Sequence, residues 1–185
     1  PGARSIDGHT QGYDDDDGST PAHVAAALSA FATDRSTEPA ALAALVGSRL
    51  LVPVVAVLGE VEYDEQGRPH DKTSEMAAVL LKRADGQKAL LAFTSMKSMA
   101  AWDPQARPVP VSTAEACRSA LQEEAAAVVI DIAGPVRFVI DGTDLSAAAQ
   151  GLRLVGLDDG RWGWLAVPGT EIDSFDADSV NHPPA

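Results

Sequence analysis

Three aspartates close to the ends of apolar segments are the side chains best placed for chemistry. Asp131 ends one apolar run, and Asp141 and Asp144 follow the next run. Carboxylates at strand ends can act as general acids or bases or bind cations, and Arg137 nearby would suit an anionic ligand. Asp141 and Asp144 also match turn and helix N-cap positions, where aspartate accepts backbone hydrogen bonds. The sequence favours the structural role and keeps a ligand site at Asp131, Arg137, Asp141 and Asp144 as the alternative.

A second group of side chains suits contact with another macromolecule. Trp162 and Trp164 flank a glycine on a predicted strand, so both rings point to one face of it. A buried face would make them core residues, whereas an exposed face would make them an adhesive patch of the kind enriched at interfaces. Met99 and Trp102 share a predicted helix that suits packing and adaptable binding alike. These four residues form the candidate binding surface.

Signatures of common catalytic and metal sites are absent from the sequence. There is no Gly-Lys dipeptide for a phosphate-binding loop, and no GxSxG, HExxH or CxxC pattern. The histidines are scattered, and the run Asp14–Asp17 lacks the ligand spacing of a calcium loop. Cys117 lies on the apolar face of a predicted helix, which is typical of a core residue. We therefore expect no catalytic residue, no metal and no cofactor, and an enzyme is the less favoured class.

Charge and composition restrict the partners. The chain of 185 residues has 14 Lys and Arg against 27 Asp and Glu, a net charge of −13. Such a balance argues against nucleic acid, whose phosphates repel an acidic surface. No apolar run approaches the roughly 20 residues of a membrane span. A single cysteine and no evident secretory signal predict a reducing, cytoplasmic location. We expect a protein partner, one with a basic surface or a second copy in a homodimer.

The elements that must position these side chains form one predicted domain, at residues 21–167. It lies between acidic tails, 1–20 and 168–185, that are too polar to bury a core and are expected to be disordered. The fold class is α+β, a single domain with a mixed, largely antiparallel sheet flanked by helices. Helices are predicted from Pro21, over 38–46, 96–102, 114–124 and 145–149; strands are predicted at 50–57, 76–82, 87–93, 109–111, 126–132, 136–140, 152–157 and 161–167.

The stretch 51–151 resembles the N-terminal domain of the SseB family, in its actinobacterial type. The residues that carry the resemblance are Phe93-Thr94-Ser95 at a strand end, the helix up to Trp102, and Val128–Asp131 followed by Gly134-Pro135. The resemblance implies a small cytoplasmic α+β protein and supplies no active site. It agrees with a non-catalytic interaction or regulatory domain. The alternative is a small-molecule-binding or metal-binding domain, or an enzyme, that uses the carboxylates near Asp131, Asp141 and Asp144.

Overall fold

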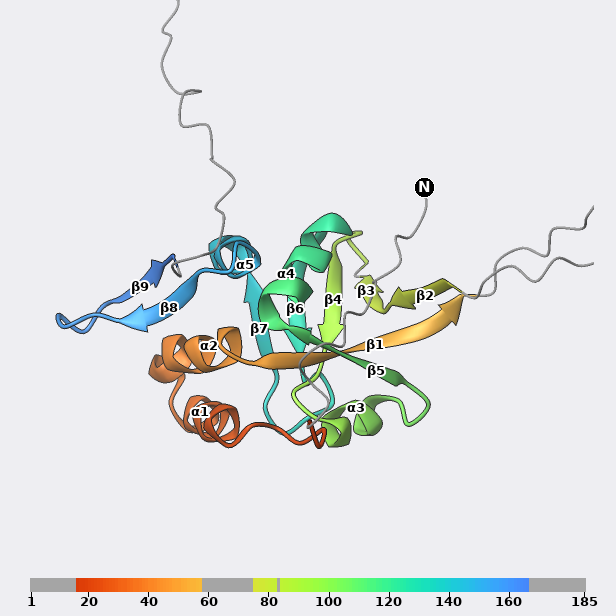
Figure 1. The fold of residues 1–185 in the computed structure, drawn as a ribbon, viewed down its shortest axis with the longest axis horizontal. Helices are drawn as coiled ribbons and strands as arrows, with labels where there is room; N and C mark the ends of the chain where they lie inside the picture. The colour runs from red at the N-terminus through yellow and green to blue at the C-terminus, as the bar shows by residue number, and fades with distance from the viewer. Residues whose placement is uncertain (1–15, 58–74, 83, 167–185) are drawn as a thin grey trace, which may run out of the picture.

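The α+β class is confirmed, and the helices and strands follow the predicted order with one difference (Figure 1). The single strand predicted at 76–82 is divided into two strands, 75–78 and 80–82, which belong to different sheets. The structure is a computed structural model that describes residues 16–57, 75–82 and 84–166. Residues 1–15 and 168–185 of the predicted tails lie outside this description. The helices are α1 (Ala22–Thr33), α2 (Glu38–Val46), α3 (Met96–Trp102), α4 (Thr113–Gln122) and α5 (Gly142–Ala149), with a 3₁₀ turn at Arg35–Thr37. The strands are β1 (Arg49–Val57), β2 (Glu75–Ala78), β3 (Leu80–Lys82), β4 (Lys88–Ala92), β5 (Arg107–Ser112), β6 (Ala125–Ile130), β7 (Phe138–Asp141), β8 (Arg153–Gly156) and β9 (Trp162–Leu165).

The strands are divided among three sheets instead of one continuous sheet. Their orders are β2–β1–β5, β3–β4–β6–β7 and β8–β9. Every pairing among the described strands is antiparallel except β4 with β6, which are parallel and are connected through α3, β5 and α4. The two larger sheets touch where Leu51 and Phe93 exchange backbone hydrogen bonds of 2.8 Å. The predicted mixed, largely antiparallel arrangement holds within this division.

Strand β4 is buried on both faces, which explains its continuous apolar run. Leu90 and Ala92 point into the main hydrophobic cluster, to which α1, α2, α4 and α5 all contribute. Leu91 and, just past the strand end, Phe93 join a smaller cluster on the other side, where Met99 of α3 packs. A strand covered on both sides has no polar face, so the run shows no alternation of polar and apolar residues.

Capping residues and one glycine fix the local turns. Ser112 accepts from the backbone N–H of Glu115, and the Glu115 carboxylate accepts from the Ser112 backbone N–H, so α4 begins with a capping box. Ser95 and Ser98 cap α3 in the same reciprocal way. Gly86 has a φ of +88° in the turn between β3 and β4, a conformation that favours glycine. These signals explain why the element boundaries follow the sequence closely here.

Three prolines share one register between β1 and β5. Pro53 lies opposite Pro108, and Leu51 lies opposite Pro110. The Leu51 N–H points away from β5, toward the carbonyl of Phe93. In an antiparallel pair such positions alternate with the hydrogen-bonded ones, so all three prolines occupy positions that need no N–H toward the neighbouring strand.

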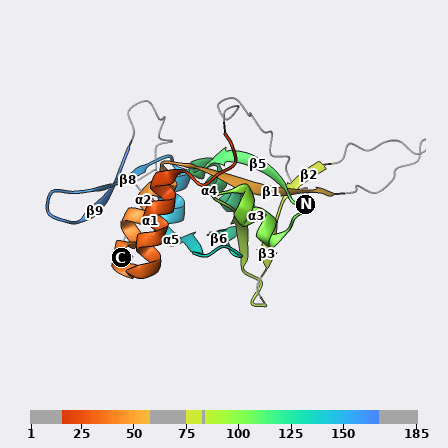
Figure 2. The ribbon, with the colours of Figure 1, turned by 90° about the horizontal axis from the view of Figure 1, so that it is seen from below.

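Strands β8 and β9 form a two-stranded ribbon that projects from the side of the body next to α2 (Figures 1 and 2). Trp164 near its base packs against the main cluster, and its indole N–H donates to Asp144 at the start of α5 over 3.1 Å. The tip turns at Gly160, beyond the last paired residues. Within the part of the chain that the structure describes, we find no helix with the length and apolarity that a membrane span requires.

Candidate functional site

The carboxyl ends of the parallel strands β4 and β6 lie side by side, and each is followed by a polar residue. Thr94 and Ser95 follow β4, and Asp131 follows β6. The backbone N–H of Asp131 donates to the carbonyl of Ala92, so the parallel ladder continues to this point. Crevices outside the carboxyl ends of parallel strands are common ligand sites in mixed α/β sheets.

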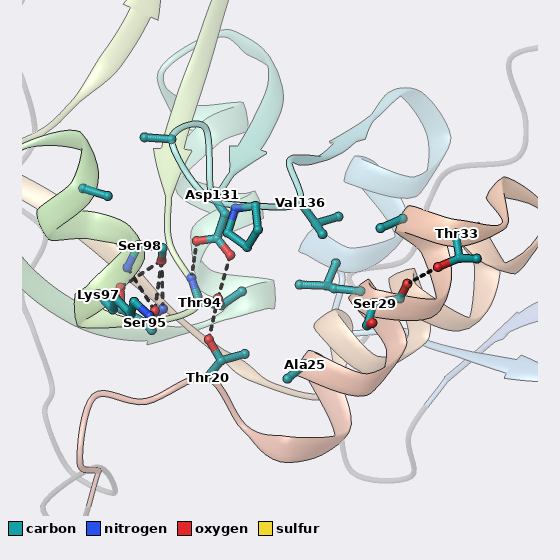
Figure 3. Close-up of a pocket in the computed structure, with 16 residues that line it drawn as sticks. Thr20, Ala25, Ser29, Thr33, Thr94, Ser95, Lys97, Ser98, Asp131 and Val136 are labelled. Carbon is teal, nitrogen blue, oxygen red and sulfur yellow. Dashed lines mark hydrogen bonds between the residues drawn. The ribbon is translucent and has the colours of Figure 1, made fainter.

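Asp131 is the most constrained residue at this edge. It has a φ of +52°, in the left-handed region that only glycine, asparagine and aspartate adopt at low cost, and is 4% exposed. Its carboxylate accepts from the backbone N–H of Thr94 at 2.9 Å and from the Thr94 hydroxyl at 2.6 Å (Figure 3). Gly134 donates to the Asp131 carbonyl, and a Cβ at Gly134 would lie 3.0 Å from that of Asp131. A side chain at 134 would therefore crowd Asp131, which would have to shift by a few tenths of an ångström to admit it.

Arg49, at the start of β1, connects Thr94 to the segment that precedes α1. Its guanidinium forms a two-point ion pair with the Asp16 carboxylate and donates to the carbonyls of Thr94 and Ser19. Thr20 adds a hydroxyl contact of 2.9 Å with Thr94. The hydrogen bonds from Arg49, helped by the backbone N–H of Gly18 and by the Arg49 charge, hold the pKa of Asp16 below its usual value against the opposing effect of burial. Residues 16–20, which the sequence assigns to the acidic tail, are thus bound to the domain.

A groove of about 580 Å³ opens beside these residues, between α1, α3 and the turn after β6 (Figure 3). We call it the α1–α3 groove. Asp131 and Thr94 lie at its inner end, together with Ser98 of α3. Its volume is within the range of small-molecule sites, and most of its surface is apolar. Its walls include Ala25, Leu28, Ser29, Ala32, Lys97, Ala101 and Val136.

The structure separates the aspartates that the sequence grouped. Asp141 pairs with Ala127 near the start of β6, so it lies at the opposite end of the β6–β7 pair from Asp131. It occupies the N-cap position of α5 without a side-chain cap bond, and Asp144 in the first turn accepts from Trp164. A shared site for the three carboxylates is therefore wrong. Among the described residues no three His, Cys, Asp or Glu side chains gather where they could hold a metal ion.

Arg137 lies at the Asp131 end of the β6–β7 pair but opens into a different hollow. That hollow, of about 540 Å³, also contains Arg35 and Glu38, and the turn at Gly134 separates it from the α1–α3 groove. Arg35 lies over the ring of Phe31, 4.2 Å from its centroid. Arg137 is exposed, so any anion there would meet water-accessible guanidinium groups, not a built pocket.

The four candidate contact residues lie in two separate places, Met99 and Trp102 on α3 and Trp162 and Trp164 on β9. Met99 is buried in the smaller cluster, where the half-buried Trp102 packs against Phe93 with ring centroids 5.6 Å apart. Met99 presents no surface to a partner, so its place on a contact surface is wrong. Trp164 anchors the ribbon to the body, whereas Trp162 remains 40% exposed. The two indoles share a face of β9, but Trp164 is bound to the body of the domain and Trp162 is exposed to solvent.

Cys117 is buried among the α4 residues of the main cluster. Burial raises the pKa of its thiol to about 12, against a smaller opposing effect of Arg118. We expect the folded protein to react with an aromatic disulfide reagent at pH 8 far more slowly than the protein unfolded in guanidinium, because the thiolate is the reactive form. Absorbance of the released thiol measures both rates. Equal rates would show that Cys117 is accessible and reactive in the fold.

Sequence reasoning missed Arg49 and Thr94 as members of the site. Arg49 is the first residue of an otherwise apolar strand, and no periodic pattern marks it. Its contacts span 33 residues to Asp16 and 45 to Thr94. Thr94 stood in the segment that carried the family resemblance, but only as part of a strand end. The available signal was the pair of polar residues, Thr94 and Asp131, directly after two buried apolar runs.

Comparison with known proteins identifies the family. A family model described as the SseB protein N-terminal domain matches residues 24–147. The match extends from α1 to α5, so it includes α1 and α2, which precede the stretch on which the resemblance was based, and it contains Arg49, Thr94 and Asp131. No curated protein and no solved structure gives a significant match. Because the matched residues make up well over half of the 185, the chain belongs to the SseB family through its N-terminal domain.

Proposed function

We propose that this chain is a non-catalytic interaction or regulatory domain that contacts a protein partner through the β8–β9 ribbon. The observation that carries the proposal is the exposure of apolar side chains on both faces of this projecting ribbon. Trp162 is 40% exposed on one face, with its ring over Gly156 of β8. Leu165, by strand alternation, lies on the other face and is 52% exposed.

The ribbon has the features of a protein contact. Tryptophan is among the side chains that contribute most to binding energy when a partner covers it, because it buries a large area with few rotatable bonds. The anchor at Trp164 and Asp144 holds the base, so little order has to be gained on binding. The net charge of −13 favours a partner with a basic surface, since opposite fields accelerate encounter.

Location and lineage complete the proposal. One cysteine, buried and unpaired, suits a reducing compartment, and we infer a cytoplasmic protein. The excess of alanine, and of arginine over lysine, supports an actinobacterial member of the family. The ribbon lies outside the residues that match the family model, so we infer that its partner is particular to this chain or to near relatives.

Replacement of Trp162 by alanine is expected to abolish partner binding and leave the fold intact. Wild type, Trp162→Ala and Leu121→Ala would serve as baits in a native lysate, with retained proteins compared by mass spectrometry. Leu121, on α4, is 44% exposed and controls for the loss of any exposed apolar side chain. We expect one set of proteins to be lost only with Trp162→Ala, and the melting temperature to change by less than about 2 °C.

Light scattering of the purified chain separates the two kinds of partner. A dimer that dissociates in Trp162→Ala but not in Leu121→Ala would identify a second copy as the partner. A monomeric wild type that retains the same proteins as Trp162→Ala would contradict the proposal.

A further inference from the structure

Asp131 is a buried carboxylate without a cation beside it. It accepts two hydrogen bonds, both from Thr94, and in the described part of the chain it forms no ion pair. A carboxylate has about four acceptor positions, so Asp131 retains unused ones. An ionised carboxyl that is 4% exposed is costly unless a positive charge or further donors compensate it. The residue lines the α1–α3 groove, so a compensating group can enter from outside.

Most of the surface of the α1–α3 groove is apolar, although hydroxyl side chains such as Ser29 and Thr33 also line it. The aliphatic residues that line it include Leu28, Val136, Ala25, Ala32 and Ala101. The hydroxyls of Thr94 and Ser98 already bond within the protein. The groove therefore offers one buried negative group at the inner end of a mostly aliphatic channel.

Charges around the groove favour a cation over an anion. Lys97 is the one basic residue that lines it, and its side chain is on the exposed surface of α3. Arg49 lies behind Thr94 and is fully engaged by Asp16, Thr94 and Ser19. An anion at the inner end would meet the Asp131 carboxylate, whereas the one basic side chain that lines the groove, Lys97, is exposed to solvent on α3.

We propose that the α1–α3 groove binds a small organic cation, a primary ammonium group on a compact aliphatic body, with Asp131 as its counter-ion. The ammonium group donates to the Asp131 carboxylate, and the aliphatic body contacts Leu28, Val136 and the alanines of the walls. This site is independent of the β8–β9 ribbon, which lies elsewhere on the molecule.

Titration of the full chain with matched small probes tests the proposal. The probes are n-butylammonium and cyclohexylammonium, with 1-butanol and butyrate as neutral and anionic controls. Amide chemical shifts would be followed by NMR at about 150 mM salt, which screens loose attraction to the acidic surface. We expect the amines to shift the amides of Thr94 and Gly134, with affinities at least about ten-fold above those of both controls.

Variants at and near the groove locate the binding. Asp131→Asn should weaken amine binding by about ten-fold or more, since asparagine tolerates the same backbone angles but carries no charge. Asp141→Asn changes the charge equally at the other end of β7 and should bind as wild type does. Ala101→Leu, which fills the groove and leaves Asp131 in place, should also weaken binding, whereas Ala100→Leu, one residue away on the exposed surface of α3, should not.

Several results would overturn the proposal. Equal shifts with butanol or butyrate, shifts confined to amides away from the groove, or unchanged amine affinity in Ala101→Leu would each do so. The last variant also decides the matter if Asp131→Asn fails to fold.

Discussion

Arg49→Met is expected to destabilise the protein by about 2–4 kcal/mol, a large loss for a single substitution. Methionine keeps much of the length of the side chain but leaves the Thr94 and Ser19 carbonyls and the Asp16 carboxylate without their donor. The Asp16 side chain is 18% exposed, so water recovers part of the lost interaction. Urea unfolding followed by fluorescence measures the change in the free energy of unfolding.

The control is Arg107→Met on β5, which makes the same change of charge and volume at an exposed arginine. We expect it to cost less than about 0.5 kcal/mol. A similar loss in the two variants would mean that net charge, and not the Arg49 contacts, determines the result.

The contact between Arg49 and Asp16 also makes the stability of the protein depend on pH. Because the pKa of Asp16 is lowered in the folded protein, chiefly by hydrogen bonds from Arg49, the contact stabilises the fold fully above the usual carboxyl pKa of about 4. The stabilisation is lost as the pH falls through the lowered value. Between about pH 5 and pH 2 the wild type should therefore lose more stability than Arg49→Met does, and parallel curves would contradict the role given to Asp16.

Thr94→Val is expected to cost about 2 kcal/mol, although it preserves the shape of the side chain. The hydroxyl donates to Asp131 over 2.6 Å and contacts Thr20, and valine removes both interactions while the backbone N–H still reaches the carboxylate. A hydrogen bond to an ionised acceptor is worth roughly twice one to a neutral acceptor. Chemical unfolding of the variant and the wild type gives the difference.

Thr113→Val is the matched comparison. Thr113 is equally buried, and its hydroxyl donates to the neutral carbonyls of Leu45 and Ser48 at 2.7 and 3.0 Å. Its loss should cost about 1 kcal/mol. If Thr113→Val is the more damaging of the two, the Thr94 hydroxyl does not make the stronger hydrogen bond that we assign to it.

Local signals in the sequence were sufficient to predict most helices, strands and turns, but they were not sufficient to predict which residues form the candidate site. The capping box of Ser112 and the glycine turn at Gly86 act over three or four residues, so their patterns are visible in the sequence. Asp131 was correctly singled out as a residue after a buried strand. Its partners were wrong because the β6–β7 register places Asp141 opposite Ala127, and a register is set by pairing across the sheet.

Long-range contacts explain the remaining differences. The hydrogen bonds of Arg49 with Asp16 and Thr94 form only when three distant segments of the chain come together in the fold. No pattern within a single segment predicts them. The alternation at Trp162 and Trp164 correctly predicts a common face, but only the packing of the ribbon against α5 decides that one indole is held and the other exposed.

The prolines of β5 have a consequence for the solution behaviour of the three-stranded sheet. β5 is an edge strand of this sheet, and Pro108 and Pro110 stand at the positions whose amides would face outward. An incoming strand would find carbonyl acceptors there without the alternating donors that a ladder needs. The prolines therefore prevent another strand from pairing with the β5 edge, as would happen in a fibril or a strand-swapped dimer. Replacing Pro108 and Pro110 by alanine would restore the outward amides and permit such pairing, with little change in the stability of the fold.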